Sequence, residues 1–557
     1  MQKYKITFLI FLILVITFIA FLPSLKNGFV NWDDSTYVIN NQIIRSFSCE
    51  NVKSVFTSFF FVNYQPLTIL SYSLDYHFYR LNPFGYHLTN LILHLLNCLL
   101  VFWLIFVFSY SLPISFITAI LFAVHPLRVE SVAWISERKD VLYSFFYLGA
   151  MISYCYYLLK GRASKYYYLS LSLFILSISA KVVAASLSLA LFLIDYIMDR
   201  KRDKDRFTDK IPFFILSFIF GVAAIFAVKG VDKIVFQKNF LDRFMSAGYA
   251  VIFYLKKIFI PINLSCLYPL PEKTATFPIF FLVTVILVMA LFFLTRRFRV
   301  IVFCGMLYLI TLLPIMQFIP IGGYTIVSDR YTYIPSIWIF YAASEFFVWL
   351  YKKNIKYDQA RRIFLVIILI GIIIILAVLT WKRCGMWKDD VSLWSDPIRK
   401  HHDSTMAYRN RGYAYFNKGE YDKAAGDFNK ALEIDPNSKF DYNGRGAALG
   451  KIGKTDDAIS DFNKAIKIDQ NYSEAYYNKG IAYMQKDDLV RAISDFDRAI
   501  KIDPDNTGAR FKRAVAYLIK KEYDKSWRDL CAIEKLRGKD KVDPLFREYV
   551  RKKLNQN

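Results

Sequence analysis

The chain has 557 residues, of which 55% are hydrophobic and 18% aromatic, and its formal net charge is +25. This composition argues against a soluble multidomain protein, because many apolar runs approach the roughly 20 residues that a bilayer requires. Much of the Lys and Arg lies in short segments between these runs, where the positive-inside rule explains it, so we discount nucleic acid as a partner. The sequence therefore predicts an all-α, polytopic membrane protein.

The N-terminal segment has the basic start (Met1–Lys5) and apolar core (Ile6–Leu22) of a secretory signal. No small-residue cleavage site follows the core, so we expect a retained first span with a cytoplasmic N-terminus. Hydropathy and loop charge predict about 11 spans, all within a membrane bundle over residues 1–381. These spans lie near residues 6–23, 89–109, 112–125, 141–159, 166–181, 182–198, 211–228, 275–295, 300–319, 335–351 and 363–381.

Loop charge also predicts the orientation of the spans. Four segments rich in Lys and Arg are expected to be cytoplasmic: Lys160–Lys165, Asp199–Lys210, Arg296–Arg299 and Tyr351–Arg362. They share one side only if Asp242–Ile260 lies in the membrane interface and does not span. Its internal lysine pair suits a helix that buries one face and extends its lysines toward water. The remaining polar segments and the C-terminal domain then face outward.

Two adjacent carboxylates, Asp33 and Asp34, follow the first span within the segment Asn31–Ser35. Such a pair at the mouth of a membrane bundle can act as a general base or bind a cation. The alternative is a structural role, because Asp is also a common turn residue and helix N-cap. We predict Asp33 and Asp34 as the catalytic residues.

The stretch His125–Asp140 places Glu130, Trp134 and Arg138 at i, i+4 and i+8, which predicts one helix face with an acid, an aromatic and a base. The alternative is an interfacial helix with a Trp anchor and a structural ion pair.

Cations are expected near the outer ends of several spans, where the positive-inside rule does not explain them. A guanidinium can bind a phosphate through two hydrogen bonds, and a Lys adds a point charge, although Lys181 could also simply extend toward water. An anionic lipid-linked substrate would explain these cations together. The predicted donor-binding residues are Arg138, Lys139, Lys181, Arg330, His125 and Glu130.

From about Ser404 a 34-residue repeat begins. Its period is kept by Gly412, Gly446, Gly480 and Ala514, and by Phe428, Phe462, Phe496 and Leu530. Small residues where two helices touch, with an aromatic plug, are similar to the tetratricopeptide repeat and predict a soluble α-solenoid of about four units. We expect a linker at residues 382–403, the repeats at 404–540 and a basic tail at 541–557. Asn410, Asn443 and Asn478 recur on the expected concave face and are predicted to contact the backbone of an acceptor peptide.

Other motifs are weak. The seven cysteines form no CxxC pair, which argues against a zinc site or a disulfide scaffold. The segment Gly453-Lys454-Thr455 ends like a phosphate-binding loop, but Ala448 stands where that loop requires Gly. No metal-ligand residues and no certain cofactor are predicted. A divalent cation at Asp33 and Asp34 would need further oxygen ligands, so metal dependence stays open.

Several short motifs stand together with the repeats: Phe29–Asp34, Tyr64–Leu67, Gly85–Asn90, His125–Asp140 and Asp329–Pro335. In combination they resemble the transmembrane and tetratricopeptide-repeat protein O-mannosyltransferase family and its bacterial relatives, over essentially the whole chain. The resemblance implies a GT-C fold and a sugar carried on a polyprenyl phosphate. It also implies an acidic base in the first external loop, matching Asp33 or Asp34. Basic residues near the membrane would hold the lipid phosphate, matching Arg138, Lys181 and Arg330.

These expectations describe an inverting membrane glycosyltransferase that moves mannose or a similar sugar to a protein hydroxyl on the extracytoplasmic or lumenal face. The repeats would recruit the acceptor. Two alternatives stay open: a non-catalytic membrane scaffold that recruits partners through its repeats, and a transferase that extends a lipid-linked glycan. The usage of Lys, Ile, Phe, Tyr and Asn favours a bacterial inner membrane over the endoplasmic reticulum.

Overall fold

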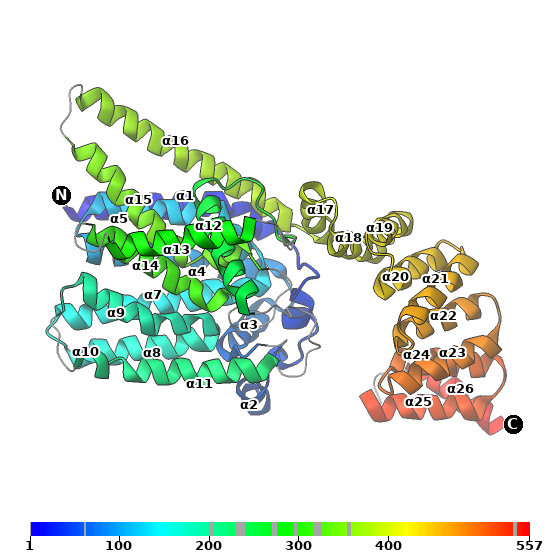
Figure 1. Cartoon of the computed structure of the whole chain (residues 1–557). Helices are drawn as coiled ribbons and strands as arrows, with labels where there is room; N and C mark the ends of the chain where they lie inside the picture. Colours follow the sequence, from blue (N-terminus) through cyan, green and yellow to red (C-terminus); the bar gives the residue numbers. More distant parts are fainter. Residues whose placement is uncertain are drawn as a thin grey trace. The chain divides into compact units, whose positions relative to one another are not determined.

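The computed structural model of the chain is helical throughout the part that it describes (Figure 1). The described residues are 2–60, 63–200, 205–228, 240–269, 276–293, 298–316, 326–353, 358–537 and 543–556. Among them the one β-type contact is an isolated bridge between Phe60 and Asn63. The chain divides into two compact units, Met1–Asp396 and Pro397–Asn557.

The boundary between the units falls inside the segment expected as a linker, residues 382–403. Most of this segment is nevertheless helical, because α17 runs from Asp390 to Lys400.

Most long helices of unit 1 run side by side in Figure 1, whereas α16 runs at an angle to them, and the short helices α2 and α3 gather with nearby loops at one end. Its helices are α1 (Gln2–Phe21), α2 (Cys49–Thr57), α3 (Pro66–Tyr79), α4 (Pro83–Ser109), α5 (Leu112–Val124), α6 (Val129–Ala133), α7 (Arg138–Leu159), α8 (Ser164–Ala180), α9 (Leu187–Ile197), α10 (Asp205–Thr208), α11 (Ile211–Val228), α12 (Phe240–Phe259), α13 (Thr276–Phe293), α14 (Arg299–Leu312), α15 (Pro335–Lys352), α16 (Asp358–Cys384) and α17.

The expected count of about 11 spans is not confirmed. Within the described residues five helical segments are long and apolar enough to cross a bilayer, or six if the bent pair α5 and Pro126–Ala133 counts as one span. The five are Tyr4–Lys26, Pro83–Ser109, Ile135–Leu159, Arg206–Ala227 and Asp358–Trp387. Helices such as Val182–Ile197 and Arg299–Ile315 are apolar but shorter. At 1.5 Å per residue they fall short of the roughly 30 Å hydrocarbon core.

Several charges that bear on orientation, Lys201, Arg202, Arg296 and Arg297, lie outside the described residues. The segment Asp242–Ile260 forms most of α12, which is not among the five. Lys257 Nζ donates to the carbonyls of Ile262 and Asn263, at 2.7 and 3.2 Å. The interfacial position of α12 stays a prediction.

A buried core fixes the end of unit 1 at α2 and α3. Its members are Tyr37, Val38, Ile44, Val55, Ile69, Tyr72, Tyr86 and Ile135. The core joins the segment after the first span to the chain just before α7, and Tyr72 Oη donates to the Ile135 carbonyl at 3.0 Å. Residues far apart in sequence are thereby held together at this end of the bundle.

Unit 2 consists of four antiparallel helix pairs and one further helix. The pairs are α18 (Thr405–Asn417) with α19 (Tyr421–Ile434), α20 (Lys439–Lys451) with α21 (Thr455–Ile468), α22 (Ser473–Gln485) with α23 (Leu489–Ile502), and α24 (Thr507–Ile519) with α25 (Tyr523–Arg537). A Cβ at Gly446 would lie 2.8 Å from the Phe462 ring, and one at Gly480 would lie 2.6 Å from Phe496. The periodic glycines are therefore required by the close packing of the aromatic plugs. The last helix, α26 (Pro544–Gln556), buries Val550 against the final pair.

Candidate active site

Asp34 holds together the turn that contains the predicted acid pair, through hydrogen bonds to its carboxylate. Its carboxylate is buried and accepts hydrogen bonds from the Val30 amide at 2.9 Å, from the Ser136 amide at 3.0 Å, and from the Ser136 hydroxyl. Burial raises the pKa of Asp34 to about 7, although the hydrogen bonds from Ser136 and Val30 oppose this shift. Asp34 therefore ties the turn to the chain before α7, and both of its oxygens are engaged.

Asp33 has a different environment. Its side chain is partly exposed, and within the described residues its carboxylate makes no hydrogen bond. Burial raises the pKa of Asp33, while the charge of Lys139 lowers it, that of Glu137 raises it and that of Arg330 lowers it. A carboxylate with unoccupied lone pairs and a raised pKa is suited to accept a proton. The geometry favours Asp33 over Asp34 as a base.

Three of the predicted cations meet at one carboxylate, Glu137. Glu137 Oε1 lies 3.1 Å from Lys139 Nζ and 3.3 Å from Arg330 Nε, and Oε2 lies 3.7 Å from Lys181 Nζ. The Glu137 side chain is 2% exposed, whereas those of Lys139, Arg330 and Lys181 are 10%, 15% and 16% exposed. The carboxylate therefore lies beneath three cations that each reach the surface in part. Sequence reasoning missed Glu137, although an acid next to Arg138 and Lys139 was visible.

Two of these cations, Arg330 and Lys181, each have a second carboxylate partner. Arg330 pairs with Glu130 through its guanidinium, and its amide donates to Glu130 Oε2 at 3.0 Å. Lys181 Nζ lies 2.5 Å from Asp140 Oδ1, a residue that sequence reasoning also missed. The Arg330 guanidinium lies 5.0 Å from the centre of the Tyr331 ring, and Lys181 Nζ lies 6.0 Å from it. These contacts hold the cations without engaging all of their donors.

The expectation that Glu130, Trp134 and Arg138 share one helix face is wrong. The helix ends at Ala133 and Trp134 is extended, with φ −92° and ψ 119°. Asn90 stabilises this break, because its side-chain amide donates to the carbonyls of Val132 and Trp134 at 3.3 and 3.2 Å. The Trp134 carbonyl also accepts from the Glu137 amide at 3.2 Å, which begins the short 3-10 turn before α7.

Two predicted donor residues are directed away from the cluster at Glu137. Arg138 is fully buried, pairs with Asp75 at 2.5 Å and donates to Asn90 Oδ1 at 2.8 Å. His125 is buried, with Nε2 3.0 Å from the Ile258 carbonyl. Their contacts are structural, because neither side chain is accessible to a ligand.

Within the described ranges, no group of three or more His, Cys, Asp and Glu side chains is arranged to hold a metal ion. The clustered carboxylates Glu130, Glu137 and Asp140 are instead paired with cations.

The three predicted acceptor-binding residues lie on the first helices of successive repeats. Asn443 is buried, and its side-chain amide lies 3.4 Å from Tyr472 Oη. Asn478 is partly exposed and donates to Asn443 Oδ1 at 2.9 Å, so these two residues link neighbouring repeats. Asn410 is partly exposed.

A bundle with membrane-length apolar helices and a charged cluster at one end, followed by repeated helix pairs, defines a membrane protein with a repeat unit. The family model described as "Tetratricopeptide repeat" matches residues 406–438 and 473–506, and the one described as "TPR repeat" matches 446–487. The predicted tetratricopeptide repeats are therefore confirmed.

The relatives are protein O-mannosyl-transferases. One from Caenorhabditis elegans is 24% identical over 408 residues, which cover 69% of this chain and 56% of that protein. Protein O-mannosyl-transferase TMTC1 from Homo sapiens is 34% identical over 145 residues, covering 24% of this chain and 16% of that protein. The chain thus spans little more than half of the first relative. The solved structure of YrrB, a TPR protein with an unusual peptide-binding site, covers 29% of this chain and 81% of its own, with 21% identity and a TM-score of 0.25.

The sequence motifs and these relatives agree: the chain resembles proteins named protein O-mannosyl-transferase, and it carries tetratricopeptide repeats.

Proposed function

We propose that this chain is a membrane glycosyltransferase that moves mannose or a similar sugar from a polyprenyl phosphate to a hydroxyl of a protein acceptor. The observation that carries the proposal is the meeting of Lys139, Lys181 and Arg330 at Glu137, beside the Asp33 carboxylate. Two partly exposed cations, Lys181 and Arg330, with the more deeply buried Lys139 beside them, suit a phosphate, and a neighbouring carboxylate without hydrogen bonds in the described residues suits proton transfer.

The reaction follows from these charges. Asp33 takes the proton of the acceptor hydroxyl while the hydroxyl oxygen forms a bond to the anomeric carbon of the sugar. The bond from that carbon to the phosphate oxygen breaks, and the polyprenyl phosphate leaves with the electron pair. Lys139, Lys181 and Arg330 stabilise the negative charge on the departing phosphate. A single displacement of this kind inverts the anomeric carbon.

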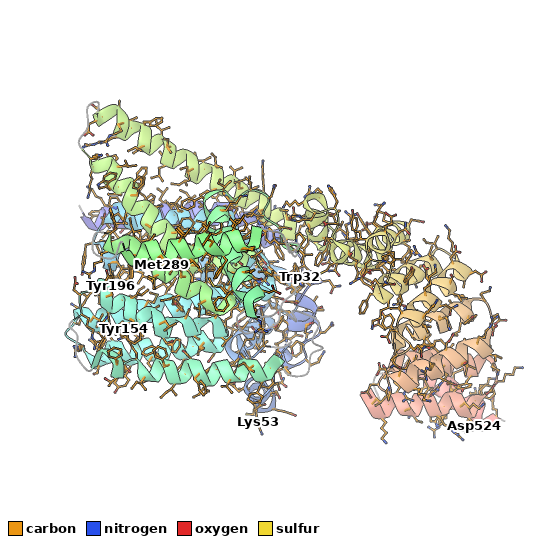
Figure 2. The ribbon with its side chains drawn as sticks, in the orientation of Figure 1. Trp32, Lys53, Tyr154, Tyr196, Met289 and Asp524 are labelled. Carbon is orange, nitrogen blue, oxygen red and sulfur yellow. The ribbon has the colours of Figure 1, made fainter. Side chains whose placement is uncertain are left out.

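The distribution of charge in unit 1 supports an outward-facing site. Figure 2 places Trp32 at the end near α2 and α3, and Tyr154 at the opposite end. The Tyr154 hydroxyl accepts hydrogen bonds from Lys210 Nζ at 2.7 Å and from Arg200 Nη1 at 3.0 Å. By the positive-inside rule the end with these cations is cytoplasmic. The site then faces outward from a bacterial inner membrane, or into the lumen of the endoplasmic reticulum in a eukaryote.

The repeats would select the acceptor. Asn410 and Asn478 are the better placed of the three predicted contact residues, because both are partly exposed while Asn443 is buried. An Asn amide can pair with the backbone of an extended peptide, a common mode of sequence-tolerant recognition.

The proposal is tested by transfer of radiolabelled sugar from polyprenyl phosphate mannose, and from a panel of other lipid-linked sugars, by membranes that contain the wild type or Arg330→Met. We expect labelled envelope protein with the wild type and little with the variant. Label in a lipid-linked glycan would instead support the glycan-extending alternative. No labelling from any donor would overturn the proposal in favour of a scaffold.

A further inference from the structure

The turn that carries Asp33 rests on the last part of unit 1, between the end of α16 and the first turns of α17. Asn27 Nδ2 donates to the Cys384 carbonyl at 3.0 Å, and the Gly28 amide donates to the Lys388 carbonyl at 3.0 Å. The Asn31 amide donates to the Asp390 carboxylate. Residues 27–31 are therefore bonded at successive points along residues 384–390.

Tryptophan rings continue this contact beyond the hydrogen bonds. The ring centre of Trp32 lies 4.9 Å from that of Trp394 in α17 and 5.0 Å from that of Trp134. Trp134 in turn stacks on Trp387 at 5.2 Å. Trp134, Trp387 and Trp394 are each 1% exposed, and Trp32 is partly exposed. Four indoles from three segments thus form one column.

The column excludes one otherwise attractive role for Trp32. An indole next to an acid often suggests a platform on which a sugar stacks, which needs an open ring face. Neighbouring rings lie against Trp32 on both the Trp134 and the Trp394 side, at tilts of 33° and 37°. Two indoles therefore pack against the Trp32 ring, so we assign Trp32 a packing role.

Asp33 depends on its neighbours for its position, because its own carboxylate makes no hydrogen bond in the described part of the chain. On one side Asp34 is fixed by Val30 and Ser136. On the other side Trp32 is fixed by the indole column. We infer that Trp394 is a positioning residue, which acts through Trp32 to hold the Asp33 carboxylate facing Lys139 and Arg330. The inference rests on the proposed function and adds a role for α17.

The inference is tested in the full-length protein with Trp394→Ala and Trp394→Phe. We expect Trp394→Ala to lower kcat for sugar transfer about tenfold, equivalent to about 1.4 kcal/mol, and to leave the donor KM within about twofold. Trp394→Phe should recover most of the loss, because a phenyl ring still covers one face of Trp32. The matched control is Trp338→Ala, because Trp338 is equally buried but packs against Phe303 in the bundle. An equal loss in the control, or a rise in donor KM that matches the fall in kcat, would overturn the inference.

A second readout separates this inference from the proposed function. Asp33→Cys introduces a thiol whose labelling by a small charged maleimide reports the position of the turn without any transfer, once the exposed Cys49 and Cys531 are changed to Ser. We expect Trp394→Ala to change the labelling rate severalfold, and Trp394→Phe and Trp338→Ala to leave it nearly unchanged. If transfer is absent from the wild type but the labelling rate changes as expected, only the proposed function fails. An unchanged labelling rate in Trp394→Ala would overturn the positioning role.

Discussion

Glu137 and Arg330 lie far apart in the sequence, yet Glu137 Oε1 is 3.3 Å from Arg330 Nε. The same carboxylate contacts Lys139 and Lys181. A carboxylate among three cations holds them at fixed positions, and in the proposed reaction this supplies the preorganisation that electrostatic catalysis requires. In that reaction it would also offset part of their charge, so that a phosphate product is not held too strongly.

The first prediction concerns Glu137→Gln, which removes this charge but keeps the shape of the side chain. We expect kcat to fall about tenfold, because the cations lose a common partner, and polyprenyl phosphate to inhibit more strongly, because the net positive charge rises. Steady-state kinetics with polyprenyl phosphate as inhibitor measures both effects. Asp358→Asn, which breaks exposed pairs with Arg361 and Arg362 on α16, serves as control. Weaker inhibition in Glu137→Gln would count against this role.

The second prediction separates the two adjacent acids. Asp33→Asn removes the base and should lower transfer by roughly 10²–10⁴-fold, the usual contribution of general base catalysis. Its carboxylate makes no hydrogen bond in the described residues and burial disfavours its charge, so the thermal stability of the protein should not fall. Transfer assays and the Tm in detergent, measured on the same preparations, test this pair of outcomes. Full activity in Asp33→Asn would remove Asp33 as the base.

The third prediction uses the buried state of Asp34. Burial raises the pKa of Asp34 in the folded protein to about 7, above a usual value of 3.8. The folded chain therefore holds a proton that the unfolded chain releases, and the stabilising contribution of Asp34 is complete below about pH 4 and lost as the pH rises through about 7. The Tm of the wild type should fall between about pH 4 and pH 7, and Asp34→Asn should reduce this fall. An identical dependence on pH in both proteins would contradict the assignment.

Much of the repeat unit was predictable from the sequence, because its period records local packing. The positions of Gly446 and Phe462 recur every 34 residues, because an aromatic ring fills the space where two helices touch. The meeting of three cations at Glu137 was only partly predictable. Lys139, Lys181 and Arg330 drew attention by their unusual charge near span ends, but Glu137 did not, because its contacts join distant segments.

The burial of the Arg138 side chain against Asp75 could not be predicted from the spacing of residues either. The pattern from Glu130 to Arg138 fits a continuous helix, but Asn90 in α4 stabilises an extended residue at Trp134. The break turns Arg138 toward Asp75 and leaves Lys139 beside Glu137. Sequence periodicity describes one segment at a time, whereas this break is imposed by a side chain from another helix.

The last prediction concerns the asparagines of the repeats. Asn443→Ala removes a buried hydrogen-bond partner of Asn478 and should destabilise unit 2 by about 1 kcal/mol. Asn478→Ala breaks the same hydrogen bond and should in addition lower transfer to envelope protein about threefold at limiting acceptor, the effect of one further lost hydrogen bond, and leave the donor KM unchanged. Asn463→Ala is the matched control, because Asn463 is exposed on the second helix of its repeat. Hydrogen exchange in α20–α22 reports the first effect and initial labelling rates the second. Equal labelling by Asn478→Ala and Asn463→Ala would show that this part of the repeat does not contact the acceptor.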